Sequence, residues 1–169
     1  SLTLEDMKKS KHSRTDLNDD QKSRMAVSIM QRMDKALKED DMLREQGKPA
    51  INKLVLLPSV QSVCNLKPMQ ESLLEYDILT SIKMWIEPID GGKGLPALSL
   101  RAPMYTLLMT LPCQADQLKK SGIGKTIVSL RQHKGETIEN KRILKGIMEK
   151  WCRPIFNKSV DSRTSHMNK

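Results

Sequence analysis

The sequence has few aromatic residues and few cysteines. Two Trp, two Tyr and one Phe are its aromatics, too few for the stacking platforms on which proteins hold single-stranded nucleic acid. The three cysteines, Cys64, Cys113 and Cys152, lie far apart in apolar helical patterns. This placement predicts small buried side chains and no structural disulfide. The core must therefore be aliphatic and rich in methionine, of which the chain has 11.

Long hydrophobic runs and metal-ligand patterns are also lacking. No apolar stretch approaches the roughly 18 to 20 residues that span a bilayer, and the first residues show no signal-peptide pattern. We therefore expect no membrane partner. His12, His133 and His166 have no His or Cys neighbour at metal-ligand spacing, so we expect neither a metal nor another cofactor.

Sequence signatures of catalysis are missing in the same way. Residues 121–126 read SGIGKT and end like a phosphate-binding loop, but that motif requires glycine where Lys119 stands. We interpret the segment as the start of a helix with close backbone packing. No cysteine has a base and an orienting group in a recognisable pattern. The sequence therefore predicts a protein that is not an enzyme.

The positive charge of the chain is concentrated in its last third. Residues 1–48 carry 11 Lys and Arg against 10 Asp and Glu, and residues 49–116 carry 5 against 6. Residues 117–169 carry 13 against 4, which accounts for the net charge of +9. A localised basic face predicts an acidic partner, either phosphate groups or an acidic protein segment.

Apolar residues recur at three- and four-residue steps along most of the chain, which predicts an all-α fold. We found no alternating run bounded by hairpin turns, so no sheet is expected. Short helices joined at Pro- and Gly-marked corners favour a right-handed bundle or superhelix of helix pairs. The expected organisation is a flexible basic arm at 1–17, a helical interaction domain at 18–159 and a flexible tail at 160–169.

Local signals predict where several helices begin and end. A capping box at Asn18 and Gln21 and caps at Ser99 and Thr137 mark expected helix starts. Pro58 is expected to separate two short helices, and Pro154 to end the last helix. The last apolar stripe ends at Trp151, which we expect to be buried.

Four segments, in order and at consistent spacing, resemble the core of a known family. They read GKPAINKLVLLPSV, SIKMWIEPIDGGKGLPALSLR, LKKSGIGKTIVSLRQHKGETIENKRI and EKWCRPIFNKS. Together they resemble the Iws/Spn transcription elongation factors, named for interacting with Spt-six. The resemblance covers roughly residues 25–159, and its last segment is similar to plant members.

This resemblance implies a domain of the TFIIS N-terminal type, a right-handed bundle of helix pairs. It implies nuclear localisation and docking of the acidic N-terminal segment of Spt-six, a histone chaperone and elongation factor. Through that partner it implies an indirect link to elongating RNA polymerase II and roles in chromatin maintenance and mRNA processing. Transcription factors are further candidate partners.

The resemblance also implies a partner-binding surface in the LKKSGIGK segment. The implied residues are Lys119, Lys120, Ser121, Gly122, Gly124 and Lys125. Ser129 lies one helical turn after Lys125, where the family commonly places an aromatic residue. Loss of a buried aromatic anchor costs about 2 kcal/mol or more in an interface of this kind, so this departure predicts weaker docking.

Two functions remain after this reasoning. The first is a non-enzymatic nuclear adaptor in transcription elongation that holds an acidic, partly apolar segment of Spt-six. The alternative is weak, direct nucleic-acid or nucleosome binding by the same basic third of the chain, through phosphate neutralisation.

Overall fold

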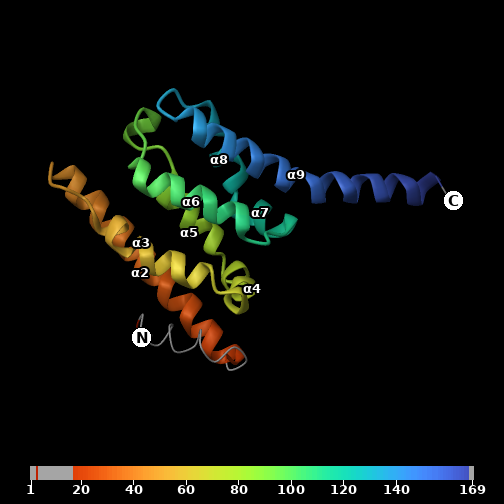
Figure 1. Ribbon diagram of the computed structural model, residues 1–169, viewed down its shortest axis with the longest axis horizontal. Helices are drawn as coiled ribbons and strands as arrows, with labels where there is room; N and C mark the ends of the chain where they lie inside the picture. Colours follow the sequence, from red (N-terminus) through yellow and green to blue (C-terminus); the bar gives the residue numbers. More distant parts are fainter. Residues whose placement is uncertain (1–2, 4–16, 168–169) are drawn as a thin grey trace.

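The chain folds into an all-helical bundle in the computed structural model, which describes residue 3 and residues 17–167, with side chains over residues 17–153 (Figure 1). One isolated bridge joins Ile89 and Gly94, and the described residues include no strand. The all-α class is confirmed. The elements are α2 (Asp19–Glu45), α3 (Asn52–Cys64), α4 (Lys67–Glu75), α5 (Ile78–Ile86), η1 (Asp90–Gly92), α6 (Leu98–Thr110), α7 (Ala115–Ser121), α8 (Ile123–Gln132) and α9 (Ile138–Met167).

Helix α2 begins where the sequence predicts and organises the first half of the bundle. The N–H of Gln21 donates to Oδ1 of Asn18 at 2.8 Å, and the N–H of Asn18 donates to Oε1 of Gln21 at 3.0 Å. These reciprocal bonds satisfy main-chain donors that have no partner within the helix. The buried face of α2 then packs against α3, α4 and α5.

Helix α3 is capped by a side chain from another helix. Its own N-cap residue, Ile51, supplies no capping side chain. Instead, Asp40 of α2 is 1% exposed and accepts the N–H groups of Asn52 at 2.9 Å and of Lys53 at 3.0 Å. A carboxylate at this end also opposes the positive end of the helix dipole. Asp40 therefore fixes the start of α3 against the end of α2.

The core is one aliphatic cluster to which each helix from α2 to α9 contributes, with Trp85 and Tyr105 as its largest fully buried aromatics. The indole Nε1 of Trp85 donates to the main-chain oxygen of Met33 at 3.0 Å, which ties α5 to α2. Trp151 is 6% exposed, which confirms that it closes the buried stripe of α9. No helix in the described ranges combines the length and the apolar character needed to cross a bilayer.

Two prolines, Pro58 and Pro103, lie inside helices. Pro58 is within α3, so the two short helices predicted there form one. Pro103 is within α6, which begins at Leu98 after an N-cap at Ala97, so Ser99 does not cap it. A proline inside a helix costs about 3 kcal/mol. Both helices bury large side chains before and after the proline, and this burial outweighs the lost hydrogen bond.

The last helix also continues past its predicted end. Helix α9 runs through the position of Pro154 to Met167 and projects beyond the bundle (Figure 1). Residues 155–167 contain neither glycine nor a second proline to stop it. Residues 160–167 are therefore helical where a flexible tail was expected, and the mobility of that segment stays a prediction. The arm expected at 1–17 lies, except for residues 3 and 17, outside the described residues.

The cysteines differ from one another in burial. Cys64 is buried as expected, whereas Cys113 is half-buried and Cys152 is exposed. Trp151 faces the core. The next residue along α9, Cys152, therefore points away from the core and is exposed. Burial raises the pKa of the Cys64 thiol to about 12 and that of Cys113 to about 11. Both are therefore protonated and unreactive at neutral pH.

Candidate partner-binding face

The corner between α7 and α8 is built by two of the predicted site residues, Ser121 and Gly122. Gly122 has a φ of 68°, a left-handed conformation that glycine adopts readily, and its N–H donates to the main-chain oxygen of Leu118 at 3.1 Å. The hydroxyl of Ser121, 6% exposed, donates to the same oxygen at 3.1 Å and accepts the N–H of Ile123 at 3.2 Å. Ser121 therefore supports the corner from inside.

The remaining predicted residues lie on the outer side of this corner. Lys119 and Lys120 are exposed in the last turn of α7, where cations oppose the negative end of the helix dipole. Lys125 and Ser129 are exposed one turn apart on α8. The structure thus brings four exposed predicted side chains onto the outer surface of two consecutive helices, which we call the α7–α8 face.

Gly124 has open space above it. A Cβ added there would meet no atom within 4 Å, so the close backbone packing expected at this glycine is wrong. The packing of α8 depends instead on its inner side, where Ile123, Ile127 and Leu130 are fully buried. Gly124 itself is half-buried and precedes the exposed Lys125.

The basic character of the α7–α8 face extends into the start of α9. Arg131, Lys134, Arg142 and Lys145 are all exposed. None of them, and none of the three lysines of the α7–α8 face, forms an ion pair with a described residue. Their charges are therefore available to an acidic partner.

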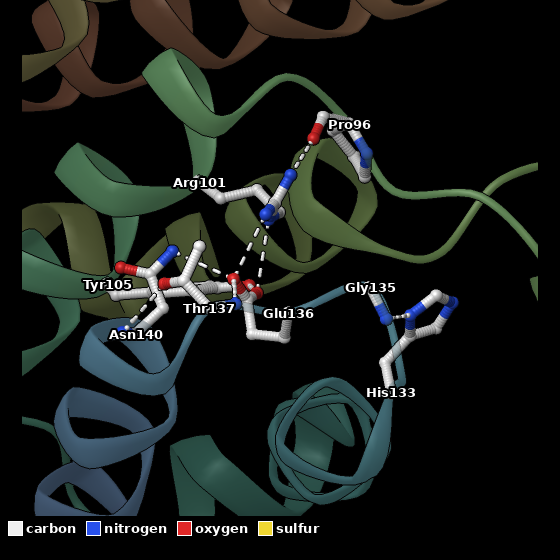
Figure 2. Close-up of polar contacts among 8 residues, drawn as sticks. All are labelled: Pro96, Arg101, Tyr105, His133, Gly135, Glu136, Thr137 and Asn140. Atoms are coloured by element: carbon white, nitrogen blue, oxygen red, sulfur yellow. Dashed lines mark hydrogen bonds and ion pairs between the residues drawn. The ribbon is translucent and has the colours of Figure 1, made fainter.

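A buried polar cluster holds the loop between α8 and α9 against α6 (Figure 2). The guanidinium of Arg101 donates to both carboxylate oxygens of Glu136, at 3.1 and 3.0 Å, and to the main-chain oxygen of Pro96. Tyr105 donates its hydroxyl to Glu136 at 2.7 Å, and the side-chain amide of Asn140 donates at 2.9 Å. This cluster sets the position of the loop that joins the two helices of the basic region.

The protonation states of the cluster follow from burial and hydrogen bonding. Burial raises the pKa of Glu136, but hydrogen bonds from Arg101, Tyr105, Asn140 and the N–H of Thr137 together lower it below its usual value. Burial and the hydrogen bond to Glu136 raise the pKa of Tyr105. Glu136 is therefore an ionised acceptor and Tyr105 a neutral donor at neutral pH.

A second contact ties the same loop to the segment between α5 and α6. The N–H of Gly135 donates to Nδ1 of His133 at 2.9 Å, so Nε2 carries the proton and donates to the main-chain oxygen of Gly92 at 2.8 Å. Figure 2 shows His133 beside Gly135, away from the Arg101 cluster. His133 is thus a structural residue.

Sequence reasoning missed the cluster because Arg101 and Tyr105 of α6 lie 35 and 31 residues before Glu136 in the chain. The only local signal is the cap at Thr137, whose hydroxyl accepts the N–H of Asn140 at 3.0 Å as predicted. Within the described ranges, no group of three or more His, Cys, Asp and Glu side chains is placed to hold a metal ion. The arrangement offers binding surfaces and structural contacts.

Comparisons with known proteins show what the chain is similar to. Residues 106–155 match the Med26 family model, described as a TFIIS helical bundle-like domain, which confirms the expected TFIIS type of bundle. The chain is 38% identical over 156 residues to Protein IWS1 homolog 1 of Arabidopsis thaliana, covering 89% of this chain and 31% of that relative. It is 35% identical over 137 residues to Transcription factor iws-1 of Neurospora crassa, covering 80% and 32%. The chain thus spans about a third of the length of the curated relatives it matches.

A solved structure has the same arrangement of helices. The chain matches a chain in the crystal structure of a Spt6-Iws1(Spn1) complex from Encephalitozoon cuniculi with a TM-score of 0.76 and 29% identity. The match covers 80% of this chain and 98% of that one. The sequence relatives and the solved structure therefore agree on one helical unit that makes up most of the present chain.

Proposed function

Because the chain belongs to the IWS1 family, we propose that it is a non-enzymatic nuclear adaptor in transcription elongation that docks an acidic segment of an Spt6-type partner. The observation that carries this proposal is the likeness to a chain crystallised in a Spt6-Iws1(Spn1) complex, which spans nearly all of that chain. RNA polymerase II would be reached indirectly through this partner.

The α7–α8 face suits an acidic segment for two reasons. Lys119, Lys120 and Lys125 are exposed and without an ion pair among the described residues, so an approaching carboxylate would not have to displace a native partner. Val128 of α8 is 37% exposed and adds an apolar contact beside them. Charge would speed the encounter and set its register, and apolar contact would supply affinity.

Two small residues determine how closely a partner could approach. The open space above Gly124 would admit a partner side chain or main chain close to α8. Ser129 stands on the same exposed surface, one turn after Lys125. Where the resembling family has an aromatic residue, this chain offers a hydroxyl, so the apolar anchor of the face is reduced.

Calorimetry with one acidic peptide from an Spt6 N-terminal segment tests this assignment. Lys125→Asp should leave the melting temperature nearly unchanged and weaken binding by about tenfold or more, because like charges across an interface repel. Ser129→Phe should strengthen binding by restoring an aromatic contact. Lys67→Asp, the same charge change at an exposed position of α4, is the control and should have little effect.

The outcome that contradicts the proposal is equally direct. If Lys125→Asp binds as tightly as the parent and Ser129→Phe gains nothing, the docking surface lies elsewhere on the bundle. If no elongation or chromatin factor is recovered with the parent protein from nuclear extract, the adaptor function itself is wrong.

The unpaired charges that extend along α8 and α9 support a second candidate, weak nucleic-acid or nucleosome binding. Such binding would depend on the number of cations and fall steeply with salt. Val128→Glu separates the candidates, because it removes an apolar contact while adding only one negative charge. We expect it to abolish peptide binding and to reduce DNA binding only modestly.

A further inference from the structure

Two adjoining cavities lie where the end of α2 and the start of α3 meet the segment that joins α5 to α6. Their volumes are about 470 Å³ and about 130 Å³, and both are lined by Arg44, Lys53, Ile89 and Pro96. We call the two together the α2–α5 trough. The trough is separate from the α7–α8 face, because no residue of α7 or α8 lines either cavity.

Lys53 is the unusual residue of the trough. It is 8% exposed and lines both cavities. Its main-chain N–H is bound by Asp40, but its ammonium group has no hydrogen bond or ion pair with any described residue. Burial lowers the pKa of Lys53, and the charge of Asp40 opposes this shift. The side chain is largely buried, yet the ammonium is not sealed from the cavity, so this donor is available to a ligand oxygen.

The charges around Lys53 are mainly negative. Four carboxylates line the larger cavity, those of Asp41, Glu45, Glu87 and Asp90, against the two cations Arg44 and Lys53. Asp41 is paired with Arg44, and Glu87 with Lys83 at 3.3 Å. Glu45 and Asp90 form no ion pair within the described part of the chain. In a chain of net charge +9, this is a local reversal of sign.

We propose that the α2–α5 trough binds a basic segment of a protein partner. A main-chain oxygen of that segment accepts a hydrogen bond from the ammonium of Lys53, and a lysine or arginine side chain pairs with Glu45 and Asp90. The apolar wall, formed by Met84, Pro88 and Ile89, takes the aliphatic stem of that side chain. An acidic segment is disfavoured because the carboxylates would repel it.

This inference goes beyond the acidic docking proposed above, because it concerns a different site and a partner of opposite charge. Because the trough and the α7–α8 face share no residue, one molecule could hold an acidic and a basic segment at the same time. The bundle would then join two partners and not only recognise one.

Two-dimensional amide NMR of the protein tests the inference with two blocked peptides. One alternates lysine and alanine, and the other has glutamate in place of lysine. The lysine peptide should shift amide signals of residues 41–45, 53 and 84–90. The glutamate peptide should shift residues 119–129 instead and leave the trough unchanged.

Variants decide whether the trough is the site. Glu45→Lys combined with Asp90→Asn should weaken the lysine peptide about tenfold, because both free carboxylates are lost; asparagine tolerates the positive φ of 54° at position 90. Glu71→Lys, an exposed charge change on α4, should have no such effect. Lys53→Met should also weaken the peptide while the amide spectrum stays folded.

Each result has one meaning. If the lysine peptide shifts no signal of the trough, or binds the double variant as tightly as the parent, the inference is overturned. If the lysine peptide behaves as expected but the glutamate peptide leaves residues 119–129 unshifted, the trough stands and the proposed α7–α8 face is wrong.

Discussion

The ion pair between Arg101 and Glu136 is the contact whose loss we expect to cost the bundle most. The side chains are 7% and 0% exposed, and two guanidinium nitrogens meet the two carboxylate oxygens at 3.1 and 3.0 Å. Arg101→Met keeps the apolar stem but leaves a buried carboxylate without its cation. Removing one partner of a buried pair costs about 3 to 5 kcal/mol, a large part of the 5 to 15 kcal/mol by which domains are stable.

A double-mutant cycle measures how much of that cost is the unpaired charge. Glu136→Leu alone should leave Arg101 and Tyr105 without their acceptor, whereas the double variant Arg101→Met/Glu136→Leu removes both charges. We expect the double variant to lose at least about 1 kcal/mol less than the sum of the single losses. Urea unfolding followed by circular dichroism at neutral pH gives all four free energies. A loss below about 1 kcal/mol for Arg101→Met would refute the reasoning.

The same cluster predicts that the free energy of unfolding depends on pH. The folded state holds the pKa of Glu136 below its usual value, so its contribution to stability is present above the unfolded pKa of about 4.3 and is lost as pH falls through the folded pKa. Glu136→Gln should therefore flatten the decline in the free energy of unfolding below pH 4.3. An unchanged acid limb in that variant would show that Glu136 is not the titrating group.

Three further predictions concern the core, the α7–α8 corner and the thiols. Trp151→Ala should cost about 3 to 5 kcal/mol in urea unfolding, whereas Trp151→Phe should cost much less, because the indole N–H has no partner among the described residues. Gly122→Ala should destabilise by about 1 kcal/mol, since φ is 68° there, whereas Gly124→Ala, which meets nothing within 4 Å in a helix, should raise the melting temperature. Iodoacetamide should label Cys152 and spare Cys64 in the folded protein, as mass spectrometry of peptides would show.

The helices that sequence reasoning placed correctly are those whose signals are local. The capping box at Asn18 and the cap at Thr137 involve residues three apart in the chain, so the pattern itself contains the contact. The prolines show the limit of this approach. Pro58 is a strong local signal against a continuous helix, but the burial of Leu57 and Val60 in the core is a tertiary effect and outweighs it.

The candidate site was predictable in part for the same reason. The period of α8 places Lys125 and Ser129 on its outer side and Ile127 on its inner side. The trough around Lys53 was not predictable, because its carboxylates come from α2 and from the segment after α5, and Glu45 and Glu87 are 42 residues apart in the chain. An isolated lysine in an apolar stretch gives no sign that it will be buried without a direct acceptor.

The carboxylate of Asp40 couples the start of α3 to the end of α2. The amide hydrogens of Asn52 and Lys53 are bound only as long as the last turns of α2 hold that carboxylate in place. Fraying at the end of α2 would release them to solvent even if α3 kept its own hydrogen bonds. The rate at which these two amides exchange with deuterated water therefore reports the opening of the end of α2, the neighbouring helix, and not of α3 itself.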